Sequence, residues 1–378
     1  MRVAFWLLVA VSLLWAPLHS SFPPFRAYTA QGDVLFGGFA QWDSGWFLRI
    51  ADHGYDLKQS AAFFPLYPLL IHVFAVVTRS SLVAAVLISL AAGGAGVVVL
   101  HRLARPLLGE RSADDTVLLF ALYPLAFVFT AAYSEGLFLV LAAGSFLAAV
   151  QRRSVVAGIL GALAVATRLI GLALLPALVV LLWPRRRSEF PRLVPLLLLP
   201  ATVVAYAWYL HSRNFGVRAF VDAESVFWQH HHHALGPLSG LWIASKSGYN
   251  GAAELGRHLP RGLGAPAGFP LHDQWAIWNV TQFLLLVAAL WLTWIAWRRL
   301  GPAFGLYSVA TLVIVLESPA DVVPLVSLPR YLIGDFPLFL ALAAVCSGRP
   351  RLRATVLYAF ATIGALAAVG FAHHVWIA

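Results

Sequence analysis

The residues most able to do chemistry gather in one short segment that is otherwise apolar and aromatic. Residues 41–55 read QWDSGWFLRIADHGY, with a glycine near the end that suits a helix C-terminus. Wound as a helix, this segment places Asp43 inside its apolar arc, about 20° from Ile50. An uncompensated carboxylate is costly there, so its position requires a reason. Asp43 either caps the helix through backbone N–H groups or serves catalysis, and the two roles are compatible.

A second candidate for chemistry is a run of four histidines. The run covers residues 230–233, and His211, His258 and His272 lie in the same stretch of chain. Adjacent side chains diverge, so at most two of the four converge on one ion in regular structure, and no cysteine accompanies them. We therefore predict no metal site, and we keep a metal-binding histidine loop as the alternative.

The composition places these residues in a membrane protein. Of 378 residues, 61% are hydrophobic and 11% charged, against roughly 45–50% and 25% in soluble domains. A soluble globule is excluded, because such a surface requires a lipid solvent. The formal net charge of +10 would favour a nucleic acid partner, but the arginines form short clusters between apolar runs. We therefore expect membrane lipids and no nucleic acid as partners. The clusters are 152–153, 185–187, 298–299 and 349–353.

The apolar runs predict an all-α, polytopic bundle of about 11 to 12 membrane segments, with an amphipathic surface helix in its first external loop. Residues 3–16 are expected to form a retained first helix. Placing the arginine clusters inside leaves residues 20–60 and 211–274 as two long external loops. The run 61–78, broken by two prolines, is either re-entrant or an ordinary span. The other candidate spans are 82–100, 116–132, 136–150, 154–167, 170–183, 193–210, 276–297, 303–316, 331–346 and 354–372.

Five sequence blocks in order carry a family resemblance. The block WDSGWFLRIADHGYD at 42–56 is followed by AFFPLYPLL at 62–70, and further blocks are AYSEGLF at 132–138, ATRLIG at 166–171 and LPRYL at 328–332. This series resembles the PIG-V family, the GPI mannosyltransferase 2 family with its bacterial relatives, within the GT-C class of polytopic glycosyltransferases. The blocks extend over residues 41 to 335, so we expect residues 1–378 to form one integral-membrane domain of GT-C type.

The resemblance implies a mannosyl transfer from a polyprenyl phosphate donor to a lipid-linked or glycan acceptor. It places the reaction on the non-cytoplasmic face of a bacterial plasma membrane, with an acidic residue of the first external loop as the base. That role falls on Asp43, whose carboxylate would take the proton of the attacking hydroxyl. The leaving lipid phosphate needs only positive charge nearby, so neither a metal nor another cofactor is expected.

Three residues are candidates for holding the donor phosphate. Arg168 and Arg330 interrupt apolar sequence at the predicted outer face, where a guanidinium is costly without a partner. Each of them could instead extend to lipid headgroups. His53, about 20° from Trp42 on the projected helix, could donate to phosphate or acceptor, or have no function.

The acceptor side is predicted from the remaining residues of the blocks. Glu135 could hold the acceptor, pair with Arg168, or be a solvated charge in a turn. Trp42 and Tyr67 are placed with it as acceptor-binding or supporting residues. Two other functions remain open: a transporter or flippase for a lipid-linked or polar substrate, and a non-catalytic assembly subunit. A transporter should instead place its charges at the midplane of repeated, broken helices.

Overall fold

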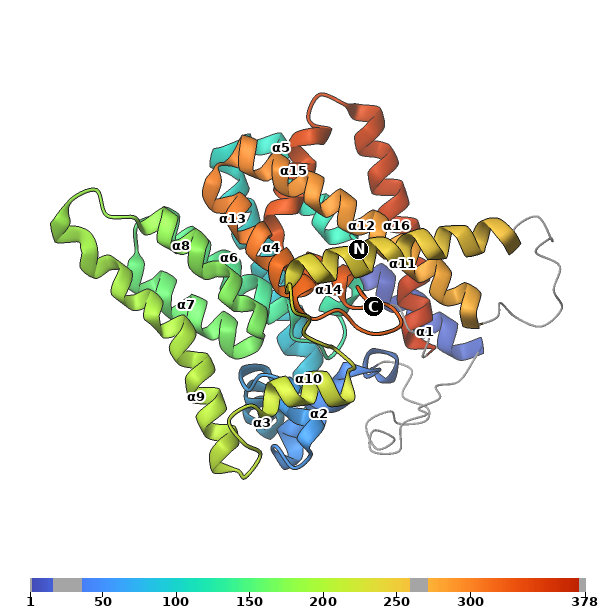
Figure 1. Cartoon of the computed structure of the whole chain (residues 1–378), viewed down its shortest axis with the longest axis horizontal. Coiled ribbons are helices and arrows are strands. Elements are labelled where there is room, and N and C mark those ends of the chain that lie inside the picture. Colours follow the sequence, from blue (N-terminus) through green and yellow to red (C-terminus); the bar gives the residue numbers. More distant parts are fainter. Residues whose placement is uncertain (1, 16–35, 259–270, 374–378) are drawn as a thin grey trace.

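A computed structural model gives the fold of the chain in residues 2–15, 36–258 and 271–373. Helices joined by short turns make up these ranges, and one isolated bridge, between His230 and Ala320, is the sole strand-like pairing described in them. Figure 1 shows α7, α8 and α9 on one side and the antiparallel pair α11 and α12 on the other, with α10 and α14 between them.

The first part of the chain contains nine α-helices in the described ranges. α4 packs against α6, and α6 packs against α7, so these three form the centre of this part. The helices are α1 (Arg2–Trp15), α2 (Asp43–His53), α3 (Leu66–Thr78), α4 (Ser81–Leu108), α5 (Glu110–Leu122), α6 (Glu135–Val150), α7 (Ser154–Thr167), α8 (Leu174–Leu182) and α9 (Leu198–Ser212).

The second part contains the remaining helices that the structure describes. α12 packs against both α11 and α13, and α15 returns to pack on α5 and α12. The helices are α10 (Ala219–Phe227), α11 (Pro237–His258), α12 (Leu271–Leu300), α13 (Pro302–Glu317), α14 (Leu328–Gly334), α15 (Phe336–Cys346) and α16 (Pro350–Ala372).

Several long apolar helices indicate a multi-pass membrane protein. Length and composition identify four described helices able to cross a bilayer, or five if the bent pair α14 and α15 is one span. Six shorter apolar helices of 10–17 residues accompany them. The all-helical prediction is confirmed, whereas the count of 11 to 12 membrane segments stays a prediction. The long candidates cover 81–108, 187–212, 274–300 and 350–372.

Two predicted segments differ from the structure. The predicted span 331–346 is bent by 80° between α14 and α15. Pro337 explains this break, because its ring and its missing N–H prevent the helix from continuing through it. The stretch 211–274, expected to be a loop, contains α10 and α11. α11 buries Ala244 beside Leu286 of α12, so an apolar stripe on this helix places it against the bundle.

The described part of the first predicted external loop, residues 36–60, contains α2. The apolar side chains Trp46, Phe47 and Ile50 of this helix are buried against the rest of the protein. Asp52 and His53, at its last turn, are exposed. The helix is therefore amphipathic as predicted, and its apolar arc packs on α3 and α4.

The run 61–78 forms a break followed by a short helix. A 3-10 turn covers Lys58–Ala62, and α3 then has 13 residues, about 20 Å of helix. The hydrocarbon core of a bilayer is about 30 Å thick, so α3 alone is too short to cross it without local thinning of the bilayer. Both the re-entrant and the spanning interpretation of this run remain open.

Candidate active site

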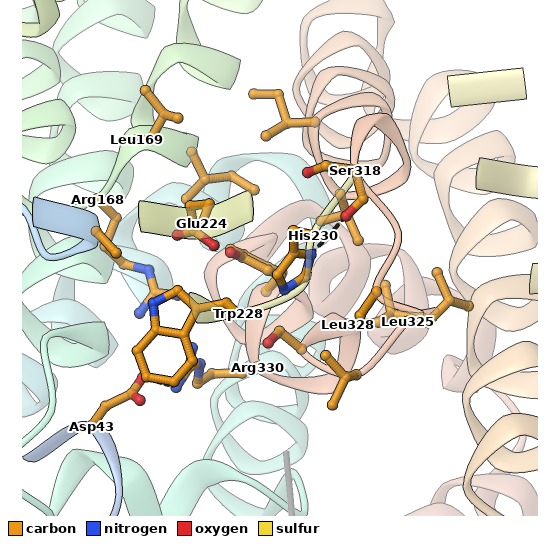
Figure 2. Close-up of a pocket in the computed structure, with 18 of the residues that line it drawn as sticks. Asp43, Arg168, Leu169, Glu224, Trp228, His230, Ser318, Leu325, Leu328 and Arg330 are labelled. Atoms are coloured by element: carbon orange, nitrogen blue, oxygen red, sulfur yellow. Dashed lines mark hydrogen bonds and ion pairs between the residues drawn. The ribbon is translucent and has the colours of Figure 1, made fainter. Parts of the chain in front are cut away.

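A cavity of about 380 Å³ lies where α2, α7, α10 and α14 meet. Figure 2 shows Asp43 and Arg330 on one side of this cavity and Glu224 and His230 on the other. The lining therefore combines residues predicted from the sequence blocks with residues from the region expected to be a loop. Its main polar and aromatic lining residues are Asp43, Arg168, Glu224, Trp228, His230 and Arg330.

Asp43 and Arg330 form an ion pair across 287 residues of sequence. Nη1 of Arg330 donates a short hydrogen bond to Oδ2 of Asp43, and the two side chains are only 14% and 16% exposed. A charge-assisted bond of this kind is stronger than a neutral one, and partial burial reduces its screening by salt. The carboxylate that seemed out of place on an apolar arc thus has a guanidinium as its partner.

Glu135 joins the second arginine to the same group of charges. Its Oε1 accepts a hydrogen bond of 2.5 Å from Nη1 of Arg168 and lies 3.5 Å from Nε of Arg330. Glu135 is 3% exposed and is not itself a lining residue of the cavity. The pairing with Arg168, one of the alternatives for Glu135, is present in the structure. We call Asp43, Glu135, Arg168 and Arg330 the charged quartet.

Aromatic rings hold both guanidinium groups of the quartet in place. Cζ of Arg168 lies 5.4 Å from the centre of the Tyr331 ring, and Cζ of Arg330 lies 5.8 Å from that of Tyr133. A cation over an aromatic face is attracted by the ring quadrupole. The two arginines are therefore fixed by rings as well as by carboxylates, and their positive charges remain next to the cavity.

The backbone before Asp43 is strained. Trp42 precedes the first residue of α2 and has φ of 56°, a value that a bulky side chain rarely adopts. Asp43 is the first residue of the helix, and Trp42 occupies the N-cap position. No side chain caps the helix. The capping alternative is therefore wrong, and the carboxylate is used for the contact with Arg330. Strain of this kind concentrates at functional sites.

Close packing between α4 and α6 positions Glu135. A Cβ atom at Gly136 would lie 2.7 Å from the carbonyl oxygen of Ser89, so only glycine permits this approach. Oγ of Ser89 donates to the carbonyl of Tyr133 at 2.7 Å and pairs with the hydroxyl of Tyr67. These contacts fix the turn that leads into α6, and with it the carboxylate of Glu135.

The other predicted site residues lie away from the cavity. Tyr67 is fully buried, and its hydroxyl is 3.0 Å from the carbonyl of Ala85, so it supports the turn before α6 and does not line the cavity. Trp42 is half-buried beside Asp43 without being a lining residue. His53 is exposed ten residues beyond Asp43, about 15 Å along α2, and the structure does not bring it to the quartet.

Among the lining residues that the sequence blocks do not contain, three lie close together on and just after α10. Glu224 on α10, Trp228 just after it and His230 form a continuous part of the lining, which we call the α10 wall. The available signal resembles that of Asp43: Glu224 lies one helical turn after Phe220 and one before Trp228, so it too is a carboxylate among apolar residues.

The histidine run divides among different partners. Nδ1 of His230 lies 2.7 Å from the carbonyl of Ser318, while Nε2 of His231 lies 3.4 Å from Asp321 and Nδ1 of His232 lies 3.7 Å from Glu317. His211 is exposed at the end of α9, and the side chains of His258 and His272 fall outside the described residues. The run therefore does not act as one cluster in the part of the chain described.

A different group of side chains has the spacing that a metal ion requires. Among the described residues, ligand atoms of His101, Glu110 and Asp114 lie within 4.8 Å of one another, at the junction of α4 and α5. Arg105 already forms an ion pair with Glu110 there, which opposes a cation. This group lies outside the cavity lining, and the expectation that the reaction needs no metal stays a prediction.

Comparison of sequences gives matches to mannosyltransferases. The family model described as mannosyltransferase (PIG-V) matches residues 7–186. GPI alpha-1,6-mannosyltransferase 2 of Cricetulus griseus is 34% identical over 149 residues, which are 36% of this chain and 30% of that protein. The enzyme of Mus musculus is 33% identical over 165 residues, or 40% of this chain and 34% of that protein. The matches therefore span about a third of the length of these curated relatives.

Comparison of structures gives a similar fold in solved structures of ArnT, over nearly the whole of this chain. The crystal structure of ArnT from Cupriavidus metallidurans bound to undecaprenyl phosphate has a TM-score of 0.53 at 19% identity, covering 97% of this chain and 63% of that one. Its apo form has a TM-score of 0.50 at 17% identity, covering 99% and 75%. At these identities the likeness concerns the fold alone, and it confirms an all-helical architecture of GT-C type.

The family match and the site geometry meet in the same residues. Asp43, Glu135 and Arg168, three members of the charged quartet, all lie within the matched range. Over residues 7–186 the chain thus matches the PIG-V mannosyltransferase family, which confirms the resemblance that the sequence blocks predicted.

Proposed function

We propose that this chain is a membrane glycosyltransferase that moves a mannosyl residue from a polyprenyl phosphate donor to a hydroxyl group of a lipid-linked or glycan acceptor. The charged quartet beside the cavity carries this proposal. Two guanidinium groups and a carboxylate at one cavity are the groups that a transfer from a sugar phosphate requires: an anion site for the leaving group and a base for the nucleophile.

In the proposed reaction an acceptor oxygen attacks the anomeric carbon of the donor in a single displacement. The bond between that carbon and the phosphate oxygen breaks, and its electron pair leaves with the lipid phosphate. Arg168 and Arg330 stabilise the developing negative charge. The proton of the attacking hydroxyl passes to Asp43.

The ion pair between Asp43 and Arg330 gives donor binding a second role. While Nη1 of Arg330 bonds Oδ2 of Asp43, that oxygen is occupied and is not available to an acceptor hydroxyl. A donor phosphate competes with Asp43 for Arg330. Occupation of the phosphate site would therefore release the carboxylate of Asp43 to contact the attacking hydroxyl.

The relatives support this choice of donor and sugar. The family model and the curated relatives are named for mannosyl transfer, and the ArnT structure of similar fold is described with undecaprenyl phosphate bound. A lipid monophosphate brings one negatively charged group to a quartet whose two arginines and two carboxylates balance. No cofactor enters the proposed reaction.

The orientation follows from the basic clusters of the sequence. Arg152 and Arg153 are predicted to be cytoplasmic, which places α2 and α10 on the outer face of a bacterial plasma membrane. Labelling of introduced thiols in a Cys346→Ser background tests this: His53→Cys should react from outside and Arg153→Cys from inside. Reaction of both from the same side would contradict an outward-facing site.

Transfer itself is tested with purified protein and a donor labelled in its sugar. We expect undecaprenyl phosphate mannose to lose its label to an octyl glycoside acceptor, with release of one undecaprenyl phosphate for each product formed. Undecaprenyl phosphate glucose is the matched donor that tests the choice of sugar. Failure to cleave either donor, with any acceptor or with water, would contradict the proposal. Movement of intact donor across a liposome membrane would instead indicate a transporter.

A further inference from the structure

The α10 wall faces the charged quartet across the cavity and has a different chemical character. Glu224 and His230 lie on one side of Trp228 in the view of Figure 2, and Asp43 and Arg330 lie on the other. All five residues line the same cavity of about 380 Å³. A ligand of the cavity would therefore meet Asp43 and Arg330 on one side of the Trp228 ring and Glu224 and His230 on the other.

His230 is held rigidly, with one ring nitrogen left over. Its backbone N–H donates to the carbonyl of Glu224 at 3.2 Å, and its Nδ1 lies 2.7 Å from the carbonyl of Ser318. A carbonyl only accepts, so Nδ1 carries the proton and, in the neutral ring, Nε2 is an acceptor. Among the described residues Nε2 has no hydrogen-bond partner, so it can accept a bond from a hydroxyl group.

Glu224 is the second group of the wall with open hydrogen-bonding capacity. Its half-buried carboxyl group has no hydrogen-bond partner among the residues that the structure describes. Burial raises the pKa of Glu224 above its ordinary value, and the charge of Asp43 acts in the same direction, against the opposite effects of His230, Arg330 and Arg168. A carboxyl group accepts hydrogen bonds when ionised and also donates one when protonated, so Glu224 can bond a hydroxyl group in either state.

The backbone directs the aromatic and imidazole rings of the wall into the cavity. Gln229, between Trp228 and His230, has φ of 56°, one of five left-handed residues other than glycine in the described chain. The Trp228 ring is fixed edge-to-face against Trp46 at 6.2 Å and Phe63 at 6.1 Å. Like Trp42 before Asp43, Gln229 is a strained residue next to lining residues, which is where such strain is usually found.

We propose that Glu224 and His230 bind hydroxyl groups of a carbohydrate acceptor beside the Trp228 ring, and so present its attacking hydroxyl to Asp43. The inference rests on the proposed function, because it assigns to the acceptor the part of the cavity that the donor phosphate would leave unoccupied. An apolar surface with a few placed polar groups is the usual construction of a small-molecule site. An anionic lipid phosphate is bound better by the two guanidinium groups of the quartet than by this wall, whose residues Glu224, Trp228 and His230 include no arginine or lysine.

The chemistry predicts strong selection for particular hydroxyl groups. A site built to bond a substrate hydroxyl rejects an analogue that lacks it, because the protein groups are then left unpaired. Glu224 and His230 should therefore act as acceptor-positioning residues. Their loss should weaken acceptor binding without changing the affinity for undecaprenyl phosphate, which meets the arginines.

The test measures two affinities for each variant of the full-length protein in detergent. The sugar probes are octyl α-mannoside and its monodeoxy analogues, and the phosphate probe is undecaprenyl phosphate. We expect wild type to bind octyl α-mannoside and at least one deoxy analogue to bind at least about tenfold more weakly. Glu224→Gln and His230→Ala should lower the affinity for octyl α-mannoside about tenfold or more, and the variants should no longer discriminate against that analogue. Their affinity for undecaprenyl phosphate should be unchanged.

Two exposed positions provide matched controls. Asp222→Asn removes a carboxylate from the same helix, and His233→Ala removes an imidazole from the same histidine run. Both should bind octyl α-mannoside as wild type does. The inference is overturned if wild type binds none of the sugars, if Glu224→Gln and His230→Ala keep wild-type discrimination, or if they lose undecaprenyl phosphate affinity to the same extent. Normal sugar binding without donor cleavage would instead count against the proposed function alone.

Discussion

The charged quartet and the α10 wall line one cavity and differ in how complete they are without a ligand. In the quartet each charged group has a partner of opposite sign, and Glu135 contacts both arginines, although Oε2 of Glu135 and Nε of Arg330 have no hydrogen-bond partner in the described structure. In the wall, the carboxyl group of Glu224 and Nε2 of His230 have no hydrogen-bond partner within the described structure. A balanced charge cluster suits exchange of one anion for another, whereas open polar groups suit a neutral ligand with hydroxyl groups.

The two regions also differ in their origin along the chain. Three members of the quartet lie in residues 7–186, which match the mannosyltransferase family, while the whole wall lies outside that range. Arg330 is the exception, because it comes from α14 and reaches Asp43. Substitutions in the quartet should therefore affect the reaction itself, and substitutions in the wall should affect which acceptor is used.

The largest expected effect is that of removing the base from the quartet. Asp43→Asn keeps the shape of the side chain but cannot take a proton, so transfer should fall about 10²- to 10⁴-fold. Binding of octyl α-mannoside should persist, because the wall is intact. The measurement is the initial rate of label transfer at matched protein concentration.

Asp52→Asn is the control for Asp43→Asn, since Asp52 lies on the same helix but is exposed. It should transfer sugar at the wild-type rate. If Asp43→Asn retains normal transfer, Asp43 is not the base and the division between a reacting quartet and a recognising wall loses its main support.

Replacing each arginine by lysine distinguishes phosphate binding from a structural role. Lysine keeps the charge but loses the planar pair of donors, so Arg168→Lys and Arg330→Lys should each shift donor dependence about tenfold to higher concentration. The shift should be larger at Arg330, which contacts both Asp43 and Glu135. Acceptor dependence should change little. Donor titration of each variant gives both quantities.

Arg213→Lys, an exposed position at the end of α9, is the matched control and should leave donor dependence unchanged. A lysine can extend to lipid headgroups as well as an arginine. An arginine of the quartet whose lysine variant titrates as wild type would thus have a structural role, and the phosphate would need another partner.

The quartet could be predicted from sequence better than the wall, for a physical reason. Asp43, Arg168 and Arg330 are charges placed in apolar sequence, and the energetic cost of that placement is visible without a structure. Their mutual contacts join α2, α7 and α14, which only the fold can bring together. Glu135 illustrates the limit: the sequence offered three roles for it, and its contact with both arginines depends on the close approach of α6 to α4.

The wall could not be predicted, because it depends on how the chain returns after α9. Glu224 is a carboxylate among apolar residues, but which neighbour its helix faces depends on the fold, so this signal alone does not identify a site. His230 was considered only as one of a run of possible metal ligands, yet it is separated from its neighbours by the strained backbone at Gln229. A helical projection also misplaced His53, because it shows angles around the axis and not the distance along it.

Glu135 offers a test of the balance within the quartet. Glu135→Gln would leave two half-buried guanidinium groups with Asp43 as the one remaining carboxylate of the quartet. Removing one partner of a buried ion pair costs about 3 kcal/mol or more, so the free protein should unfold at a lower temperature. A bound phosphate replaces the missing charge, so undecaprenyl phosphate should raise the unfolding temperature of this variant by more than that of wild type.

The control is Glu110→Gln, an exposed carboxylate at the start of α5 that pairs with the exposed Arg105. It should change neither the unfolding temperature nor its response to undecaprenyl phosphate by a comparable amount, because an exposed pair contributes little. An equal response of Glu135→Gln and wild type to the phosphate would show that the lipid does not bind at the arginines of the quartet.

The smallest expected effect is a pH dependence that belongs to the wall. The pKa of Glu224 is raised from its ordinary value of 4.5, mainly by burial, so the folded protein holds this proton at pH values where the unfolded chain has lost it. Wherever the folded state binds more protons, stability falls as the pH rises. The contribution of Glu224 is thus largest below pH 4.5 and is lost on passing upward through the raised pKa.

Glu224→Gln is neutral at every pH and should remove this loss. We expect the unfolding temperature of the variant, relative to wild type, to increase as the pH is raised from 4.5 and then to level off. Ser225→Ala, on the same helix and without a titratable group, should follow wild type throughout. A constant difference between Glu224→Gln and wild type would mean that the carboxyl group is as well solvated in the cavity as in the unfolded chain. The charges of Asp43, Arg168, Arg330 and His230 would then balance around an ionised Glu224, and the contrast between a charged quartet and a neutral wall would be wrong.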